Sequence, residues 1–553
     1  MGTSAAQVLV ASLVAHGVDR AFCVPGESYL PVLDALRDEP RVHLVTCRHE
    51  SGAGYMAVAD AKLTGRPGIC FVSRGPGATN ASIAVHTSEQ DAVPLVLFVG
   101  QVPRDVLGRG AFQEIDYARM FGSIAKLVTT VIDPAEMSAS VAHAFAIAGA
   151  GTPGPVVVVL PEDVLDQPAV ATIVPPPPAQ IAIPAAAVVE RIAALVRAAE
   201  RPILIAGGAL AGPAGRAALK AAAEALALPV VPSFKRQDIF PNAHPNFGGY
   251  LGYKIPQRQI DRLQKADLIL AVGTRLGDAT TQGFVFPSAP KPNHPLIHVY
   301  ADAAVLGRTY ETAHKLACDP TAFLLALAHF AINPTPARER WLVGLHASMA
   351  DLARWSQPPP ANDGVAFGTV VAALGYRLPD DAIVITDAGN FASWLHRYFP
   401  FGERHILIGA VSGAMGLGVP AAVAAGLRHP GRQIVTFVGD GGFLMTGNEL
   451  ATAIQTGVPV RLFVSNNRSF GTIRMHQEKS HSGRPMATDL VNPDFARLAE
   501  AFGARGFTIA SDSDVRPVVA AALAHEGPVI VDVWTSLHHI SPYATLDDLR
   551  SGT

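Results

Sequence analysis

The chain has 553 residues, a length that corresponds to about three or four domains of ordinary size. Its 43 basic and 46 acidic side chains leave a formal charge of −3, so no basic excess predicts nucleic-acid binding. Hydrophobic residues make up 49% of the chain and charged residues 16%, a composition that excludes a disordered protein.

The N-terminal 20 residues predict an amphipathic helix rather than a signal peptide. Gln7, Ser12 and His16 interrupt the apolar run, and no basic segment precedes it. No run of about 18 uninterrupted apolar residues predicts a membrane span. The four cysteines have no CxxC spacing, which predicts buried, reduced thiols. We therefore expect a cytoplasmic protein without membrane or nucleic-acid partners.

Short apolar runs alternate with alanine-rich helical patterns along the whole chain. Runs such as PGICFV, VPLVLFVG, RPILIAGG and QIVTFVGD predict buried strands of parallel sheets, since both faces of such strands are covered. The proline run Pro175–Pro178 and residues 356–363 predict two boundaries. We therefore expect an α/β protein of three doubly wound parallel-sheet domains, at residues 1–170, 185–345 and 360–553.

The first and third segments carry similar sequences at a nearly constant offset. GRPGICFVSRGPGATN begins at Gly65 and GRQIVTFVGDGGFLMT begins at Gly431, 366 positions later. VPLVLFVGQ begins at Val93 and VPVRLFVSN begins at Val458, 365 positions later. This register favours two copies of one α/β unit around a middle domain. Independent occurrence of a common strand–turn–helix composition is the alternative.

Polar residues follow two apolar runs of the third segment. QIVTFVGD ends at Asp440, within the sequence GDGG, and VRLFVSNN ends at Asn467. Open parallel sheets bind ligands at the carboxyl ends of their strands, and carboxylate and amide oxygens suit Mg²⁺. Glycines there allow a diphosphate to approach the following helix. For each motif taken alone, an ordinary turn is the alternative.

The GDG and NN motifs, with Asp440 and Asn467 27 residues apart, together resemble the signature of thiamine diphosphate-dependent decarboxylases and carboligases. Over nearly its whole length the chain is similar to the acetolactate synthase-like branch of that family. The resemblance implies a pyrimidine-binding first domain, a central domain and a diphosphate-binding third domain. It implies Mg²⁺ ligation by Asp440, Asn467 and the backbone carbonyl of Ser469. The implied cofactor-binding residues around the diphosphate are Gly439, Asp440, Gly441, Gly442 and Asn467.

Glu50 lies in CRHESGAGYMAVADA, where a strand-like run meets a helix rich in small residues. By itself, a glutamate at this place is typical of a helix start. In the family, a glutamate here hydrogen-bonds N1′ of the aminopyrimidine and favours the tautomer that activates the thiazolium ring. The resemblance therefore makes Glu50 a catalytic and cofactor-binding residue. The family takes this glutamate from the opposite subunit, which implies a homodimer and, by the family's habit, a tetramer.

The segment GAMGLG, residues 413–418, is a further match to the family. It implies that Met415 supports the bent cofactor and that the carbonyl of Gly413 accepts a hydrogen bond from N4′. DAGNF follows the apolar run DAIVIT and resembles the loop that covers the diphosphate, which makes Asn390 a cofactor contact. A methionine packed beside helix glycines is the alternative for Met415.

Five further residues are candidates for the substrate side. GAFQE resembles a loop of acetolactate synthases that places Phe112 and Gln113 at the reacting centre. Glu27, in VPGES, stands where pyruvate decarboxylases have a proton-transferring aspartate, so it is either an acid–base group or a solvated loop residue. His476 replaces the tryptophan by which acetolactate synthases select the acceptor, which speaks against branched-chain amino-acid synthesis. Arg474 and His476 are then candidates for substrate binding, and His476 is also a candidate for proton transfer. The alternative is that both are ordinary surface side chains.

The central segment resembles the flavin domain of acetolactate synthases in GGALAG and GTRLGD. Thr152 stands where flavin-binding members have an arginine, which weakens the prediction of FAD. Another nucleotide and an empty domain are the alternatives.

The sequence therefore predicts a thiamine diphosphate- and Mg²⁺-dependent lyase or transferase that decarboxylates a 2-oxo acid and joins the remainder to a second carbonyl compound. Aldehyde release, cleavage of a 2-hydroxyketone and a non-catalytic assembly or regulatory homologue are alternatives. A NAD-dependent dehydrogenase is not favoured, because CVPGES follows the first strand in place of GxGxxG. The C-terminal tail from Ser536 is a candidate cover for the site.

Overall fold

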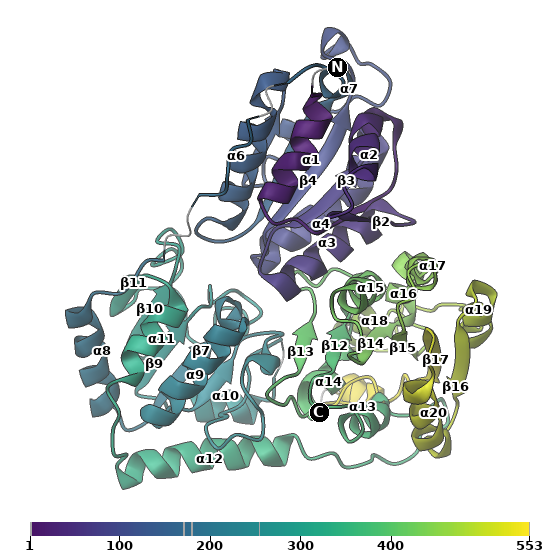
Figure 1. Ribbon diagram of the computed structural model, residues 1–553. Helices are drawn as coiled ribbons and strands as arrows, with labels where there is room; N and C mark the ends of the chain where they lie inside the picture. The colour runs from purple at the N-terminus through teal and green to yellow at the C-terminus, as the bar shows by residue number, and fades with distance from the viewer. Residues whose placement is uncertain (1–2, 170–171, 178–180, 254, 552–553) are drawn as a thin grey trace.

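Three parallel β-sheets organise the chain, as the computed structural model in Figure 1 shows. The structure describes residues 3–169, 172–177, 181–253 and 255–551. Helices accompany each sheet, which confirms the predicted α/β class with three parallel-sheet domains. In Figure 1 the first domain lies above the other two, which stand side by side beneath it.

The first domain has six strands in the spatial order β2-β1-β3-β4-β6-β5. They are β1 (Arg20–Cys23), β2 (His43–Thr46), β3 (Gly68–Val72), β4 (Leu95–Gln101), β5 (Leu127–Thr130) and β6 (Pro155–Pro161). Its helices are α1 (Ala5–Ala15), α2 (Leu30–Arg37), α3 (Glu50–Thr64), α4 (Gly75–Asp91), α5 (Tyr117–Phe121), α6 (Met137–Gly149) and α7 (Glu162–Leu165). All residues of β3, β4 and β6 are buried, because helices cover both faces of a parallel sheet.

The third domain repeats this topology, with the order β13-β12-β14-β15-β17-β16. Its strands are β12 (Ile383–Thr386), β13 (Ile406–Ile408), β14 (Ile434–Gly439), β15 (Val460–Asn466), β16 (Arg505–Ile509) and β17 (Val529–Trp534). Its helices are α13 (Phe367–Gly375), α14 (Ala392–Tyr398), α15 (Gly418–Arg428), α16 (Asp440–Thr446), α17 (Leu450–Gln455), α18 (Gly471–Ser480), α19 (Phe495–Phe502), α20 (Asp512–Ala524) and α21 (Leu546–Ser551). The two six-stranded sheets match strand for strand, which confirms the predicted duplication.

The central domain has five strands in the order β11-β10-β9-β7-β8. They are β7 (Pro202–Ala206), β8 (Val230–Pro232), β9 (Leu268–Val272), β10 (Leu296–Tyr300) and β11 (His314–Ala317). Its helices are α8 (Ala186–Ala198), α9 (Pro213–Ala225), α10 (Gln257–Leu263) and α11 (Pro320–Ala328), and α12 (Pro336–Leu352) continues toward the third domain.

The predicted domain boundaries remain predictions. In the proline run, residues 175–177 form neither helix nor strand, and Pro178 lies outside the described residues. Helix α12 runs past residue 345, and residues 354–360 have no regular structure. The four cysteines are buried free thiols, as expected. Among the described helices, none combines the length and hydropathy needed to cross a bilayer.

The segment 409–412 of the third domain, directly after β13, is held by side chains of the other two domains. Lys62 of α3 and Lys235 of the central domain donate to successive backbone carbonyls of this segment, each at 2.7 Å. Asp91, at the end of α4, accepts from its next two backbone amides at 2.7 and 3.2 Å and pairs with Lys62. Burial lowers the pKa of Lys235 to about 8 and also lowers the pKa of Lys62.

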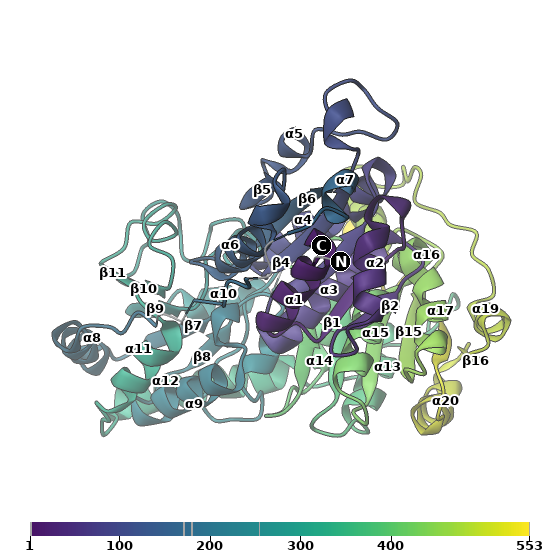
Figure 2. The same ribbon diagram turned by 45° about the horizontal axis from the view of Figure 1, so that its top comes forward.

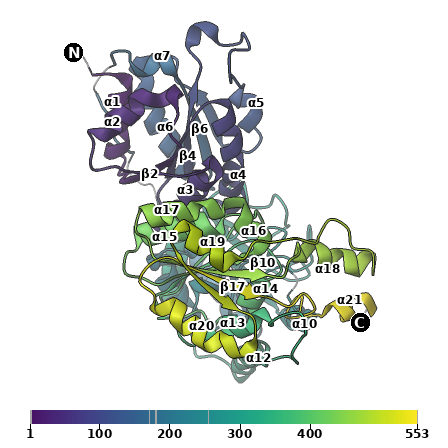
Figure 3. The same cartoon turned by 90° about the vertical axis from the view of Figure 1, so that its right-hand side faces the viewer.

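The first and third domains also share one hydrophobic core. Helix α3 packs against α15, and buried side chains from both domains form a single cluster. Arg428, at the end of α15, binds Asp60 of α3 through two hydrogen bonds of 2.8 Å. Figure 3 shows this arrangement from the side, with α3 above α15 and α17.

We expect Lys62→Met to destabilise the protein by about 3–5 kcal/mol, because it leaves Asp91 as an uncompensated buried charge. Lys220→Met removes a more exposed ion pair with Glu403, and it should cost less than about 1 kcal/mol. Urea unfolding followed by fluorescence would compare the midpoints of the two variants. Equal midpoints would contradict a structural role for the buried pair.

Candidate active site

Two neighbouring strands of the third domain bring Asp440 and Asn467 to one edge of the sheet. Asp440 opens α16 directly after β14, and Asn467 directly follows β15, which pairs with β14 in parallel. The Asp440 carboxylate is buried, and burial raises its pKa to about 6. Hydrogen bonds from Gly441, Asn492 and the amides of Arg468 and Ser469 act in the opposite sense. The carboxylate therefore faces the loop that carries Asn467 and Ser469.

Asn492 links the two strand ends and was not among the residues predicted from the sequence. Its side-chain amide donates to Asp440 Oδ2 at 2.8 Å and to Asn466 Oδ1 at 2.9 Å. Asn466 in turn donates to Asp532 of β17 at 2.9 Å. The only signal in the sequence is an Asn-Pro pair, which is typical of a turn.

Asn390 and Asn467 lie together around Gly471. A Cβ atom at Gly471 would lie 2.7 Å from Asn390 Oδ1 and from Asn467 Nδ2, so both side-chain amides approach this glycine closely. Asn467 Oδ1 accepts from the amide of Ser469 at 3.0 Å. The buried hydroxyl of Ser469 has no hydrogen-bond partner among the described residues. The structure thus brings the predicted metal and diphosphate residues to one place.

The oxygen atoms of this group fit a hard divalent cation. Within the described residues, no three His, Cys, Asp or Glu side chains form a metal-binding cluster. One buried carboxylate, one amide oxygen and backbone carbonyls remain, which is a set that suits Mg²⁺ with water and phosphate completing its coordination.

Met415 lies beside the turn that opens α16. A Cβ atom at Gly441 would lie 3.5 Å from Met415 Cε and 2.6 Å from Phe470 Cε1, so a larger residue there would displace the Phe470 ring. The backbone of Gly413 has a φ of 72°, a conformation that favours glycine. Asp387, after β12, accepts from the amide of Gly416 at 2.8 Å, and burial raises its pKa to about 6. These contacts fix the loop 413–416 against the edge of the sheet.

Glu50 is the first residue of α3 in the first domain. Its Oε2 accepts from the side chain of Asn80 at 3.0 Å. A Cβ atom at Gly77 would lie 3.5 Å from Oε1, so the start of α4 passes close to the carboxylate. The glutamate is half-buried at the carboxyl end of β2.

Glu27 and Gln113 meet at the guanidinium of Arg74, a residue that the sequence analysis did not select. Arg74 donates to Gln113 Oε1 and Glu27 Oε1, both at 3.3 Å, and to Glu162 Oε2 at 2.8 Å. Gln113 has a φ of 64°, and the neighbouring Phe112 is 75% exposed. Figure 2 shows the segment that connects β4 to α5, which carries both residues, projecting from the domain.

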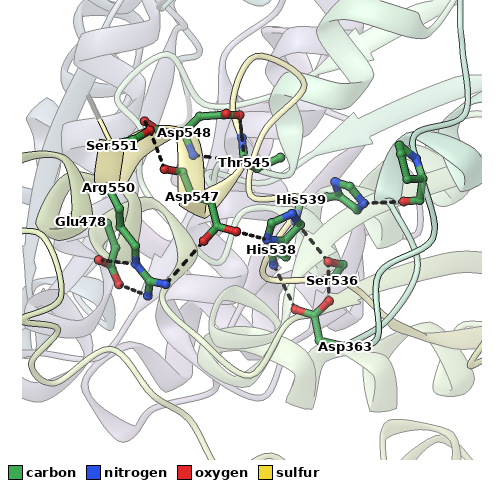
Figure 4. A network of polar contacts seen from close by, with 11 residues as sticks. Asp363, Glu478, Ser536, His538, His539, Thr545, Asp547, Asp548, Arg550 and Ser551 are labelled. Carbon is green, nitrogen blue, oxygen red and sulfur yellow. Dashed lines mark hydrogen bonds and ion pairs between the residues drawn. The ribbon is translucent and has the colours of Figure 1, made fainter. Parts of the chain in front are cut away.

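Arg474 and His476 lie on α18, beyond the Asn467 loop. Arg474 forms ion pairs with Glu478 and Asp489, both at 2.9 Å, so its charge is already compensated. Arg550 of α21 binds the same Glu478 with two hydrogen bonds, which ties the C-terminal helix to α18 (Figure 4). The exposed His476 lines the large cavity described below.

The C-terminal tail passes over Asn390. The side-chain Nδ2 of Asn390 donates to the carbonyl of Ile540 at 2.5 Å. Before this contact, Asp363 accepts from Ser536 at 2.6 Å and from the amide of His538 at 2.9 Å, as Figure 4 shows. The tail therefore forms one wall of the site.

A cavity of about 2270 Å³ opens between the three domains. Asn390, Gly413 and His476 line it, together with Gly208 and Arg275 of the central domain. Glu50, Glu27 and Gln113 of the first domain are not part of its lining, and neither are Asp440, Asn467 and Met415 of the third domain.

Comparisons with known proteins agree with this architecture. Residues 3–120, 189–327 and 387–533 match the N-terminal TPP binding, central and C-terminal TPP binding domains of thiamine pyrophosphate enzymes. The chain is 33% identical over 543 residues to the acetolactate synthase large subunit of Parasynechococcus marenigrum, which covers 96% of this chain and 87% of that protein. It is 32% identical over 541 residues to the acetolactate synthase isozyme 1 large subunit of Escherichia coli, with 96% and 93% covered.

We expect Asn492→Ala to weaken Mg²⁺-dependent binding of thiamine diphosphate by about tenfold or more, because Asn492 orients the Asp440 carboxylate. Calorimetric titration would measure the affinity. Asn448→Ala, which removes an exposed amide next to α16, is the matched control and should leave it unchanged. An Asn492→Ala variant with the parental affinity would show that Asp440 needs no such support.

Proposed function

Since the chain belongs to the thiamine pyrophosphate enzyme family, with acetolactate synthases among its relatives, we propose that it decarboxylates a 2-oxo acid and joins the remaining acyl unit to a second carbonyl compound. The observation that carries the proposal is the meeting of Asp440, Asn467 and Asn390 at the carboxyl ends of β12, β14 and β15. In this proposal Glu50, at the start of α3, supplies the carboxylate that binds the aminopyrimidine end of the cofactor.

In this proposal the third domain holds Mg²⁺ and the diphosphate. Asp440, Asn467 and the carbonyl of Ser469 ligate the metal. The glycines 439, 441 and 442 leave the start of α16 open, where the helix amides favour a negative charge. Asn390 contacts the diphosphate under the cover of the C-terminal tail.

Thiamine diphosphate, when bound, supplies the electron sink for decarboxylation. Glu50 accepts a hydrogen bond from the aminopyrimidine and thereby sets its tautomer. Met415 supports the bend between the two cofactor rings, and the carbonyl of Gly413 accepts from the pyrimidine amino group. The support for Met415 is its position beside the start of α16, since a Cβ atom at Gly441 would lie 3.5 Å from Met415 Cε.

We further propose a homodimer, in which Glu50 completes the partner's site, and a tetramer of two such dimers. Several apolar side chains near the proposed site are at least one-third exposed in the single chain, which supports burial against another subunit. They are Ile83, Phe112, Leu444, Met445 and Ile473.

The substrate side of the proposal involves Phe112, Gln113, Glu27 and His476. Phe112 and Gln113 face the reacting centre, and His476 binds substrate or transfers a proton. A second candidate function is favoured by Glu27, whose carboxylate lies beside Gln113 at the guanidinium of Arg74. Proton transfer from Glu27 would release an aldehyde in place of the coupled product. The reverse cleavage of a 2-hydroxyketone would use the same residues.

The central domain offers a site for a nucleotide. Its strand order reverses between β7 and β9, and the cavity is lined there by Gly208 and Arg275. Thr152 binds Asp302 at 2.7 Å and contributes no positive charge to a phosphate, so FAD is the weaker candidate. Mass spectrometry of small molecules released from the denatured protein would identify FAD, another nucleotide or neither.

We expect Mg²⁺- and thiamine diphosphate-reconstituted protein to release carbon dioxide from at least one member of a 2-oxo acid panel. Glu50→Gln should lower this rate by about 100-fold or more, since it removes the carboxylate that sets the tautomer. Mass analysis of the products would separate aldehydes from coupled 2-hydroxyketones.

The urea unfolding midpoint of Glu50→Gln is the control for folding, because Glu50 itself contacts the cofactor in this proposal. No carbon dioxide from any acid, with cofactor bound, would reject 2-oxo acid decarboxylation and leave hydroxyketone cleavage as the candidate.

A further inference from the structure

The first domain has a crevice that corresponds to the Asp440 site of the third domain. In each duplicated sheet the strand order reverses at one place, between β1 and β3 and between β12 and β14. Arg74 follows β3 as Asp440 follows β14, and the two residues are 366 positions apart, the offset of the repeated sequences. The same position thus carries a cation in one copy and a carboxylate in the other.

The guanidinium of Arg74 is held at short range through only one of its nitrogens. The Arg74 side chain is 10% exposed, and its backbone occupies the N-cap position of α4, where the helix dipole also favours negative charge. Glu162 holds one guanidinium nitrogen at 2.8 Å. The two remaining nitrogens make only 3.3 Å contacts, to Glu27 and Gln113.

The contact with Glu27 is the one that a ligand can replace. The Glu27 side chain is 71% exposed, and such solvated ion pairs contribute little free energy. A guanidinium presents five N–H donors in a planar fork that matches a carboxylate. Glu162 would keep Arg74 in place while an incoming carboxylate displaced Glu27.

We propose that Arg74 binds a substrate carboxylate that is retained in the product, and that Glu27 occupies this place in the free enzyme. The inference rests on the proposed function. A carboxylate that leaves as carbon dioxide is a poor partner, because binding it in the ground state raises the barrier to its loss. The retained group belongs either to the acceptor 2-oxo acid or to the far end of a dicarboxylic donor.

Calorimetric titration of the protein reconstituted with Mg²⁺ and thiamine diphosphate tests the proposal. Two unreactive probes distinguish the two possible sources of the retained carboxylate. Lactate represents the acceptor, and glutarate represents a dicarboxylic donor. We expect one of them to bind, Arg74→Met to weaken that binding by about tenfold or more, and Arg74→Lys to weaken it less. Glu27→Gln should strengthen it, because the competing carboxylate is gone.

Arg104→Met is the matched control, since it removes a nearby arginine that pairs with Asp163 at 2.8 Å, and it should leave probe affinity unchanged. Thiamine diphosphate affinity reports folding, and Arg74→Lys answers the question if Arg74→Met does not fold. Three results would overturn the proposal: binding of neither probe, parental affinity in both Arg74 variants, or weaker binding in Glu27→Gln. Arg74-dependent binding without carbon dioxide release would instead overturn the proposed reaction and leave the carboxylate site standing.

Discussion

The arrangement of the three domains depends on the segment 409–412. Two buried ammonium groups from different domains bind its carbonyls, and Asp91 binds its next two amides. Of these three charged side chains, Lys62 and Asp91 form an ion pair, whereas Lys235 binds a backbone carbonyl. The junction of the domains therefore contains buried charges around a polar backbone segment. Because the loop 413–416 begins where this segment ends, domain packing and the position of Gly413 and Met415 are set together.

The duplication explains why ligand-binding groups occur where they do. A doubly wound sheet leaves a crevice where its strand order reverses, and both copies place charged residues there. In the third domain, Asp440 is held by Asn492 and by backbone amides. In the first domain, Arg74 is held by Glu162 and Glu27. One folding unit therefore supplies sites of opposite charge without any change in topology.

The repeat, the sheet class and the meeting of Asp440 with Asn467 could be predicted from the sequence, because strand ends and register follow from apolar periodicity. Asn492 and Arg74 could not, since their roles depend on contacts between loops that have no periodic pattern. Arg474 shows the same limit: the family resemblance made it a candidate for substrate binding, but Glu478 and Asp489 compensate its charge. The domain boundaries remain predictions, and α12 ends at Leu352, inside one of the expected gaps.

The contact between Asn390 and Ile540 bears on the timing of synthesis. Ribosomes deliver a chain from its N-terminus, and early domains fold while later ones are still being made. The first sheet can form long before residue 540 has been made. The wall that the C-terminal tail forms, however, joins two residues that are 150 positions apart. Closure of that wall consequently has to wait until residue 540 has been made, and nascent chains that lack it would remain open at this edge.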